Sequence, residues 1–354
     1  MLETLEWPGA NPPKKAEGTF QVSLAKSSLP AAPPDLYAAA QELAQHAPRP
    51  AQMGSLRWGT ANWSDPALSR AELFYPRGVK TPEARLSHYA EHFRVLEVDA
   101  TFYALLSAAV VRRWVLWTPA DFRFTVKAHP VFTGHPIERS RLPAELATVT
   151  AGLNGGGKIY VNDLPPEVVR EIERRYFEAL SPLVEQGRLA AVIVQFPPWF
   201  DATRGNARQI ESLRERFPDV PFAIEFRNRT WLLPERRERV FAMLRAAQIT
   251  YVVADEPVVD RAGIPLWPAV TCPRLAMLRC HGRNRAAWAN PRASIAERFN
   301  YLYSPDELST LKIALNRLSS EAEAVYAIFS NCISDYAVLG AKGLCALMRC
   351  ESAP

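Results

Sequence analysis

The chain has 354 residues, of which 48% are hydrophobic and 22% are charged, and this is the balance of an ordinary soluble globular protein. Its length suffices for one large domain or two ordinary ones, with a substantial core. The formal charge of +5, from 42 basic and 37 acidic side chains, is too small on its own to indicate a nucleic-acid-binding protein, although it suits an anionic ligand.

Targeting and cysteine patterns predict a cytoplasmic protein without a membrane-spanning segment. No run of about 18 apolar residues occurs. The opening residues Met-Leu-Glu-Thr-Leu-Glu-Trp lack the apolar stretch of a signal peptide. The five cysteines form no Cys-x-x-Cys pair, which argues against a disulfide framework and against a zinc site.

Residues 1–52 are predicted to form a disordered or weakly ordered arm rich in proline and alanine. Their apolar residues show little periodicity, except in a short helix expected near Asp35–His46 with Asp35 as its N-cap. Because such an arm has little to bury, its removal is expected to leave stability unchanged. Docking of a partner is the alternative role. Residues 53–354 are predicted to form one domain.

Strand and helix patterns alternate through that domain. The strand patterns are Leu56–Thr60, Val95–Ala100, Phe122–Ala128, Ala190–Phe196, Phe222–Phe226, Thr250–Ala254, Leu275–Cys280 and Ala324–Ser330. The helical patterns are Pro82–Phe93, Ala108–Trp117, Pro166–Glu185, Asn206–Phe217, Pro234–Ala247, Pro305–Leu318 and Tyr336–Met348. This alternation predicts parallel strands with right-handed crossovers, and eight such units predict an α/β fold of the TIM-type (β/α)8 barrel class.

Two segments interrupt the alternation. His129–Asp163 is a long insertion after the third strand, and it contains the glycine run Gly155–Gly157. Glu256–Pro273, between the sixth and seventh strands, is too rich in proline for a long helix.

The fifth strand indicates where a site would lie. One of its faces is apolar throughout, whereas the other begins with Ala223 and ends in Glu225 and Arg227. Burying an unpaired carboxylate or guanidinium costs several kcal/mol, so these charges must pair with each other, with neighbouring strands or with a ligand. A strand whose side chains are apolar for most of its length and charged at its carboxyl end is typical of a barrel with a site at the carboxyl ends of its strands, the mouth of the barrel.

Other strands end in the same way. The polar residues at their carboxyl ends are Glu97, Asp99 and Thr101, Arg123, Thr125 and Lys127, Gln195, Asp255, Arg279 and His281, and Ser330 and Asn331. Because barrel interiors are usually filled by Val, Ile and Leu, the pattern predicts a convergent polar mouth. A purely structural ion network is the alternative.

These residues divide into two predicted roles. The candidate catalytic groups are Glu97, Asp99, Lys127, Glu225 and Asp255. The candidate ligand-binding groups are Trp63, Thr101, Tyr103, Gln195, Arg227, Trp231, Arg279, His281 and Asn331. Lys127 has three interpretations: a Schiff-base nucleophile, a cation for phosphate, or a partner of one of the carboxylates.

Further groups extend these alternatives. A divalent metal is considered as a cofactor, held by Glu97, Asp99, Glu225, Asp255 and His281, although the nearby cations would repel it. Phe102 and Trp199 also follow strand ends, where they would stack on a ligand or pack the loops. His129 and His135 lie in the long insertion, where they would close over a ligand or be solvated. Cys280 and His281 are adjacent along a strand and should point to opposite faces.

Eight ordered motifs carry a family resemblance. They are Gly59-Thr-Ala-Asn-Trp63, Phe74-Tyr-Pro76, Glu97-Val-Asp-Ala-Thr-Phe-Tyr103, Phe124-Thr-Val-Lys127, Gln195-Phe-Pro-Pro198, Glu225-Phe-Arg-Asn-Arg-Thr-Trp231, Arg279-Cys-His-Gly-Arg283 and Phe329-Ser-Asn331. Over about residues 55–348 the chain resembles domain-of-unknown-function family 72, the YecE-like proteins. The resemblance implies a TIM-type barrel and no established activity. The chain departs from that pattern at Asp99 and Ser330, where the family usually has asparagine, which would alter ligand preference.

Three functions are consistent with these patterns. The first is a barrel enzyme that acts on a small anionic or sugar-like molecule by general acid–base chemistry. The second is a nucleic-acid-binding or endonuclease-like protein, for which the barrel fold is only an analogy. The third is a non-catalytic protein that binds a small ligand at the same mouth.

Overall fold

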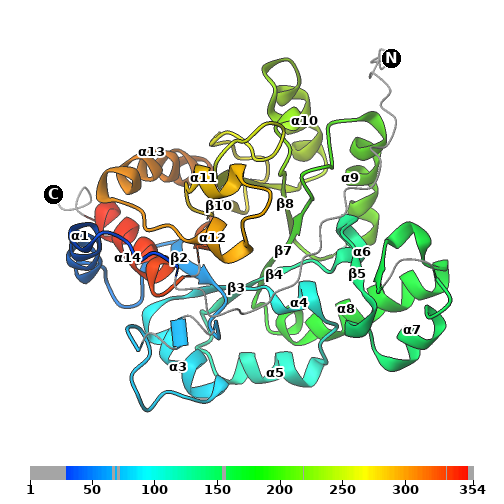
Figure 1. Cartoon of the computed structure of the whole chain (residues 1–354), viewed down its shortest axis with the longest axis horizontal. Coiled ribbons are helices and arrows are strands. Elements are labelled where there is room, and N and C mark those ends of the chain that lie inside the picture. Colours follow the sequence, from blue (N-terminus) through cyan, green and yellow to red (C-terminus); the bar gives the residue numbers. More distant parts are fainter. Residues whose placement is uncertain are drawn as a thin grey trace.

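The molecule is a closed barrel of parallel strands. The computed structural model describes residues 29–65, 68–69, 72–153, 157–217, 219–331 and 333–349. Within them, eight parallel strands close into a ring because β2 pairs with both β11 and β3 (Figure 1). In the order of the ring, the strands are β2 (Leu56–Ala61), β3 (Val95–Val98), β4 (Arg123–Lys127), β7 (Leu189–Gln195), β8 (Phe222–Glu225), β9 (Thr250–Asp255), β10 (Ala276–Cys280) and β11 (Val325–Phe329). The predicted strands and the TIM-type fold are confirmed.

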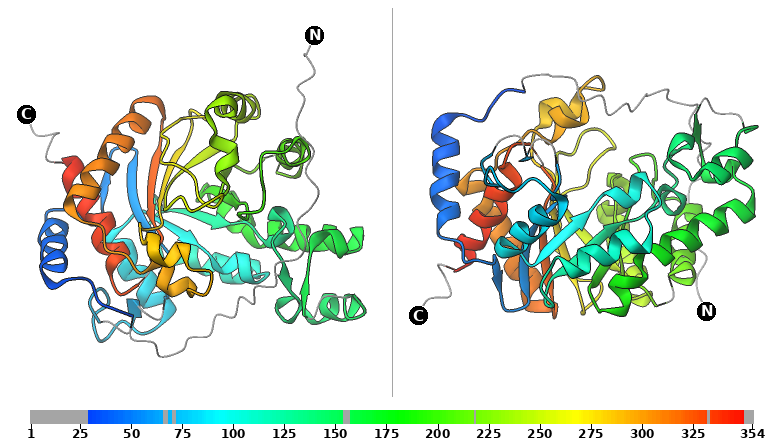
Figure 2. Two further views of the ribbon diagram at one scale, coloured as in Figure 1. Left: turned by 45° about the horizontal axis from the view of Figure 1, so that its top comes forward. Right: turned by 90° about the horizontal axis from the view of Figure 1, so that it is seen from below.

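Helices cover the outside of this barrel (Figure 2). The longer ones are α3 (Pro82–His92), α5 (Ala108–Leu116), α8 (Pro166–Glu185), α9 (Arg204–Arg216), α10 (Pro234–Ala246), α13 (Pro305–Glu321) and α14 (Tyr336–Arg349), as the sequence pattern predicts. Among the described residues, no helix combines the length and the hydrophobicity that crossing a membrane requires.

Short elements occupy the connections. After β3 comes α4 (Ala100–Tyr103), and after β8 comes the 3-10 turn η3 (Arg229–Leu232). The insertion after β4 holds α6 (Pro130–Thr133), the antiparallel pair β5 (Ile137–Glu138) and β6 (Lys158–Ile159), η1 (Arg139–Arg141), α7 (Ala144–Val149) and η2 (Val161–Asp163). In the glycine run Gly155–Gly157, Gly155 and Gly156 lie outside the described residues. The segment before β10 has no helix, as predicted, whereas α11 (Arg285–Ala289) and α12 (Ile295–Phe299) follow β10.

Two apolar cores lie on opposite faces of the barrel wall. Along β7, Val192 and Val194 belong to the large core that joins the sheet to the helices, whereas Ala191 and Ile193 belong to a smaller inner core. The inner core consists of Ala61, Val95, Ala191, Ile193, Ala223, Val252, Leu275, Met277, Tyr326 and Ile328. The alternation seen in the sequence therefore distinguishes the barrel interior from the layer beneath the helices.

Gly59 explains the glycine at the start of the first motif. A Cβ at this position would lie 2.1 Å from the carbonyl oxygen of Val95, closer than any side chain can approach. Glycine is therefore required for β2 and β3 to pair at this point, where the barrel closes.

The predicted arm contains an ordered helix where the structure describes it. Helix α1 (Pro34–Gln45) lies against α14, and Ala40 and Ala44 are buried in this contact (Figures 1 and 2). The expectation that the arm has little to bury is therefore wrong for this part, and residues 1–28 lie outside the described residues. Asp35 does not cap the helix, because Pro33 takes the N-cap position without a side-chain hydrogen bond. Before β2, β1 (Gln52–Met53) pairs with it in antiparallel fashion.

Candidate functional site

Arg279 of β10 joins two carboxylates inside the barrel. Its Nε donates to Glu97 Oε2 at 2.8 Å, its Nη2 donates to the other oxygen of Glu97, and its Nη1 donates to Glu225. Both carboxylates are fully buried, and Arg279 is 2% exposed. Charge-assisted forked bonds of this kind are among the strongest that side chains make. This cluster fills the barrel at the carboxyl ends of β3, β8 and β10.

Glu225 has further partners in the same layer. Gln195 Nε2 donates to its Oε1 at 2.6 Å, and His281 Nε2 lies 3.0 Å from the same oxygen. Since an ionised carboxylate only accepts, His281 donates from Nε2, and its Nδ1 accepts from Ser330 Oγ at 2.6 Å. Burial and the charge of Arg227 lower the pKa of His281 to about 3, so the imidazole is neutral.

Glu256 completes this network, although the sequence analysis did not select it. It forms an ion pair with Arg227, and its Oε1 accepts from the backbone N–H of Ile264 at 3.0 Å. Arg227 Nε also lies 3.4 Å from Glu225 Oε1, and the guanidinium carbon of Arg227 lies 5.1 Å from the centre of the Trp288 ring. The sequence does contain a signal for Glu256. Side chains alternate along β9 and Val252 faces inward, so Glu256, four residues later, is expected to face inward as well.

The two carboxylates bound to Arg279 differ in acidity. Burial raises the pKa of Glu97 above its usual range, with Arg279 opposing this effect and Asp99 adding to it. Burial acts in the same direction on Glu225, but the charges of Arg279 and Arg227 and the hydrogen bond from His281 outweigh it and hold the pKa of Glu225 well below its usual range. Paired acids whose pKa values are separated in this way are suited to separate roles in acid–base chemistry.

Lys127 and Asp99 lie beside this network without joining it. Among the described residues, the Lys127 amine has no ion pair or hydrogen bond, and it faces the ring of Phe102 at 4.6 Å. Burial lowers its pKa, and Asp99 is the strongest opposing charge. Within the same part of the chain, Asp99 Oδ1 is buried without a hydrogen-bond partner. The interpretation of Lys127 as a direct partner of a carboxylate is therefore not supported by the described contacts.

Asp255 does not face the barrel interior. It accepts two bonds from Arg283 Nε at 3.0 and 3.1 Å and one from Nη2 at 2.9 Å, and Tyr303 donates its hydroxyl to the same carboxylate at 2.7 Å. Asp255 lies three positions after the inward-facing Val252, so it is on the opposite face of β9. The prediction that Asp255 converges with Glu97 and the other carboxylates is wrong.

Two predicted ligand-binding residues bond to the backbone instead. Thr101 is buried in α4 and donates to the carbonyl of Lys127 at 2.7 Å. Strand β3 ends at Val98, so the predicted common face of Glu97, Asp99 and Thr101 does not continue past that residue. Asn331 donates to the carbonyl of Tyr301 at 2.7 Å, and its Oδ1 is buried without a partner in the described structure.

The aromatic residues separate into buried and exposed groups. Trp231 is fully buried and donates to the carbonyl of Phe200 at 2.7 Å, and Trp63 packs edge-on against Trp114 at 5.6 Å. These two pack the protein and are not open to a ligand in this structure. Tyr103, by contrast, is 40% exposed.

An aromatic edge lies next to Lys127. The ring of His135 contacts Phe102 at 5.2 Å and Trp199 at 5.8 Å, and Trp199 is 54% exposed. Burial, aided by the charges of Lys127 and Arg227, lowers the pKa of His135 to about 3. The imidazole therefore stays neutral in this cationic surrounding. His129 is buried and accepts from a backbone N–H, so it is not solvated.

Two groups of three potential metal ligands occur among the described residues. Their donor atoms lie within 4.8 Å of one another in each group, and the groups are Glu225, Glu256 and His281, and His88, Glu91 and His92. In the first, Arg227 contacts both carboxylates, so a guanidinium already provides their counter-charge. In the second, Lys342 bonds to His92 Nδ1 at 3.0 Å. Neither environment favours an added cation.

Comparison with known proteins places this site in a family context. Residues 57–354 match the family described as "Protein of unknown function DUF72". The chain is 29% identical over 276 residues to UPF0759 protein YunF of Bacillus subtilis. The aligned region covers 77% of this chain and 87% of that protein.

Solved structures agree with this match. A DUF72 family protein from Enterococcus faecalis superposes with a TM-score of 0.69 at 27% identity, covering 83% of this chain and 95% of that one. A DUF72 family protein from Thermotoga maritima gives a TM-score of 0.66 at 28% identity, covering 83% and 99%.

Proposed function

The chain belongs to the DUF72 family of proteins of unknown function, and we propose that it is a barrel enzyme that acts on a small anionic, sugar-like molecule at the carboxyl ends of its strands. The observation that carries this proposal is the pair formed by Lys127 and Asp99. The half-buried Lys127 amine lies against the ring of Phe102, Asp99 Oδ1 is buried close enough to act on its charge, and neither has a hydrogen-bond partner among the described residues. Polar groups without partners are costly unless something else pairs with them.

The charge of Lys127 determines the ligand class. A phosphate or carboxylate would give the amine the counter-charge that the surrounding side chains do not supply by direct contact. The exposed ring of Trp199 and the ring of Phe102 offer faces on which a sugar can stack. Asp99 Oδ1 would accept from a hydroxyl of the same molecule.

The neighbouring acids supply the chemistry. Glu97 has a pKa raised towards neutrality by burial, so it is suited to exchange a proton with the substrate. Glu225 remains ionised and anchors Arg279, which fixes the orientation of Glu97. On this proposal Lys127 positions the anionic group, Asp99 orients a hydroxyl, and Glu97 acts as general acid or base.

Thermal shift with sugar phosphates and sugar acids tests the binding part of the proposal. A ligand should raise the melting temperature of the wild type, and this rise should disappear in Lys127→Met and Asp99→Ala. Lys80→Met, which removes an exposed lysine, is the matched control and should behave as wild type. A ligand that stabilises Lys127→Met as much as wild type would place the site elsewhere.

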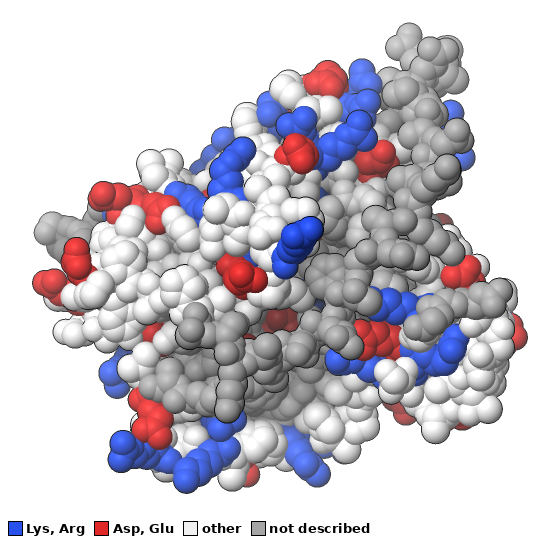
Figure 3. All heavy atoms as spheres, viewed as in Figure 1, with Lys and Arg blue, Asp and Glu red and all other residues white. Residues whose placement is uncertain are grey.

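Turnover and salt dependence separate the alternatives. NMR of the bound ligand over time should show conversion to product, and an unchanged ligand would indicate a non-catalytic binding protein. The nucleic-acid alternative predicts binding that weakens steeply with salt. On the face drawn in Figure 3, the described basic and acidic side chains are interspersed, which gives that alternative no particular support.

A further inference from the structure

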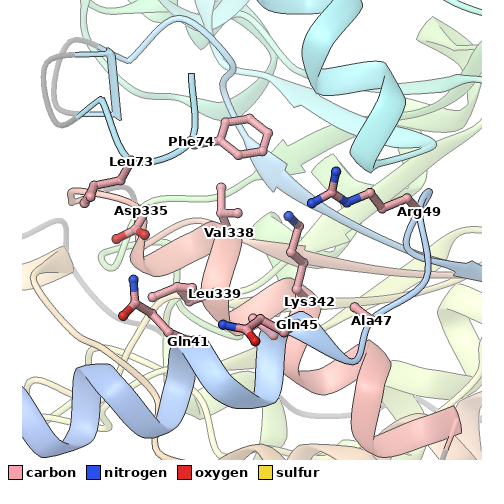
Figure 4. Close-up of a pocket in the computed structure, with 11 residues that line it drawn as sticks. Gln41, Gln45, Ala47, Arg49, Leu73, Phe74, Asp335, Val338, Leu339 and Lys342 are labelled. Atoms are coloured by element: carbon pink, nitrogen blue, oxygen red, sulfur yellow. The ribbon is translucent and has the colours of Figure 1, made fainter. Parts of the chain in front are cut away.

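A polar cavity lies outside the barrel, between α1, α14 and the segment around Phe74 (Figure 4). Its volume is about 190 Å³. An apolar cavity of about 150 Å³ accepts benzene, so this one has room for a ligand of that size. The side chains that matter for its chemistry are Gln41, Gln45, Arg49, Phe74, Asp335 and Lys342.

Positive charge dominates this cavity. Arg49 and Lys342 both line it, and among the described residues neither forms an ion pair. Burial and the charge of Arg49 lower the pKa of Lys342 to about 8, and Asp335 only partly opposes them. Lys342 is nevertheless charged at neutral pH. Two cations of the same cavity therefore repel each other without a full counter-charge.

The carboxylate in the cavity is already occupied. Asp335 accepts from the hydroxyl of Tyr37 at 3.0 and 3.2 Å, and burial raises its pKa. Lys342 donates to His92 Nδ1 at 3.0 Å, which fixes the position of the amine while leaving its charge unpaired. The cavity thus holds two cations and one carboxylate that is already hydrogen-bonded.

The remaining walls indicate the shape of a ligand. Gln41 and Gln45 are four residues apart on α1, so their amides lie on one face of the helix and can donate to an anion. Phe74 provides an apolar wall, and the Lys342 amine lies 5.6 Å from the centre of its ring. The combination suits a charged group joined to a small ring.

We propose that this cavity binds a small organic oxyanion, a phosphate or carboxylate attached to a part of about one ring in size. Arg49 and Lys342 hold the charged group, the two glutamine amides donate to it, and Phe74 packs against the ring. The glutamines and Arg49 precede residue 57, where the family match begins. The N-terminal segment therefore adds a site to the family barrel, distinct from the barrel mouth.

Isothermal titration with phenyl phosphate and benzoate tests this inference, with benzyl alcohol as the uncharged counterpart. One or both anions should bind and the alcohol should not, and the preferred anion identifies the group. Arg49→Gln and Lys342→Met should each weaken binding by about tenfold or more, as the loss of one charge-assisted contact implies. Lys80→Met and Lys127→Met should leave this affinity unchanged, which separates the cavity from the barrel mouth.

Circular dichroism first establishes that the variants fold. Lys342→Met loses its bond to His92, so it is the variant whose folding is more at risk. Arg49→Gln breaks no ion pair among the described residues, so a loss of binding in this variant reports on the cavity even if Lys342→Met does not fold. Three results would overturn the inference: no binding of either anion, equal affinity of wild type and Arg49→Gln, or loss of binding in Lys127→Met alone.

Discussion

Replacing Arg279 with methionine should destabilise the barrel strongly at neutral pH. The substitution keeps an unbranched side chain but removes the cation that holds Glu97 and Glu225, both fully buried. Breaking a buried ion pair by removing one partner costs about 3–5 kcal/mol, because the other charge stays buried without compensation. Here Glu97 loses its described ion pair and Glu225 keeps only Arg227 as a cation, so the expected loss of unfolding free energy lies within that range.

The sign of the pH dependence follows from Glu97. In the wild type burial already raises its pKa above the ordinary value, although Arg279 opposes this effect. Without Arg279 the folded-state pKa of Glu97 rises further above the unfolded value, so its unfavourable effect on stability grows as pH increases. The variant should therefore recover relative to wild type on going from pH 7 to pH 5, by up to about 1.4 kcal/mol per pH unit for each carboxylate that gains a proton.

Urea unfolding of both proteins at pH 7 and pH 5 measures this effect. Arg174→Met is a matched control, because Arg174 also bridges two glutamates, Glu171 and Glu178, through three hydrogen bonds of 2.8 to 2.9 Å. Its side chain is 59% exposed, so its removal should cost no more than about 1 kcal/mol. The reasoning is refuted if Arg279→Met and the control lose equal stability, or if the loss is no smaller at pH 5.

Further predictions concern the other charges and the N-terminal helix. Lys127→Met should be at least as stable as wild type at pH 7, because burial disfavours the charged amine. The urea midpoints of variant and wild type should converge as the pH rises towards the ordinary lysine pKa of about 10.4, where the amine loses its charge in both the folded and the unfolded protein. A clear loss of stability at pH 7 would show that Lys127 has a counter-ion. Asp255→Asn should lower the unfolding free energy by about 1–3 kcal/mol without changing ligand affinity at the mouth, because it weakens only the bonds to Arg283 and Tyr303. Weaker ligand binding would return Asp255 to the site. Deleting residues 1–50 should cost about 2 kcal/mol more than deleting residues 1–28, because the longer deletion removes α1 from α14, and equal melting temperatures would contradict this.

Period-two alternation predicted the barrel and its innermost charges correctly. Glu225 and Arg279 lie inside the described strands or at their last residue, where side chains still alternate across the wall. The same reasoning placed Cys280 and His281 on opposite faces, and the structure confirms it: Cys280 packs in the outer core and His281 faces Glu225.

The errors arise where alternation was carried past a strand or could not be oriented. Asp99 follows the last residue of β3, where the backbone has already turned into α4. All six residues of β9 are buried, so composition does not reveal which face is inward. The pattern therefore points to Asp255, whereas Glu256 is the carboxylate that joins the network. Trp231 belongs to a 3-10 turn folded back on Phe200, a tertiary contact that no local pattern encodes.

The contact between α1 and α14 has a consequence for the newly made chain. Tyr37 and its partner Asp335 are 298 residues apart in sequence. At about 5–20 residues per second, the ribosome needs roughly 15 to 60 s to synthesise that interval. Throughout that time the apolar face of the N-terminal helix has no docking surface, so it is open to chaperones and proteases until the last helix emerges.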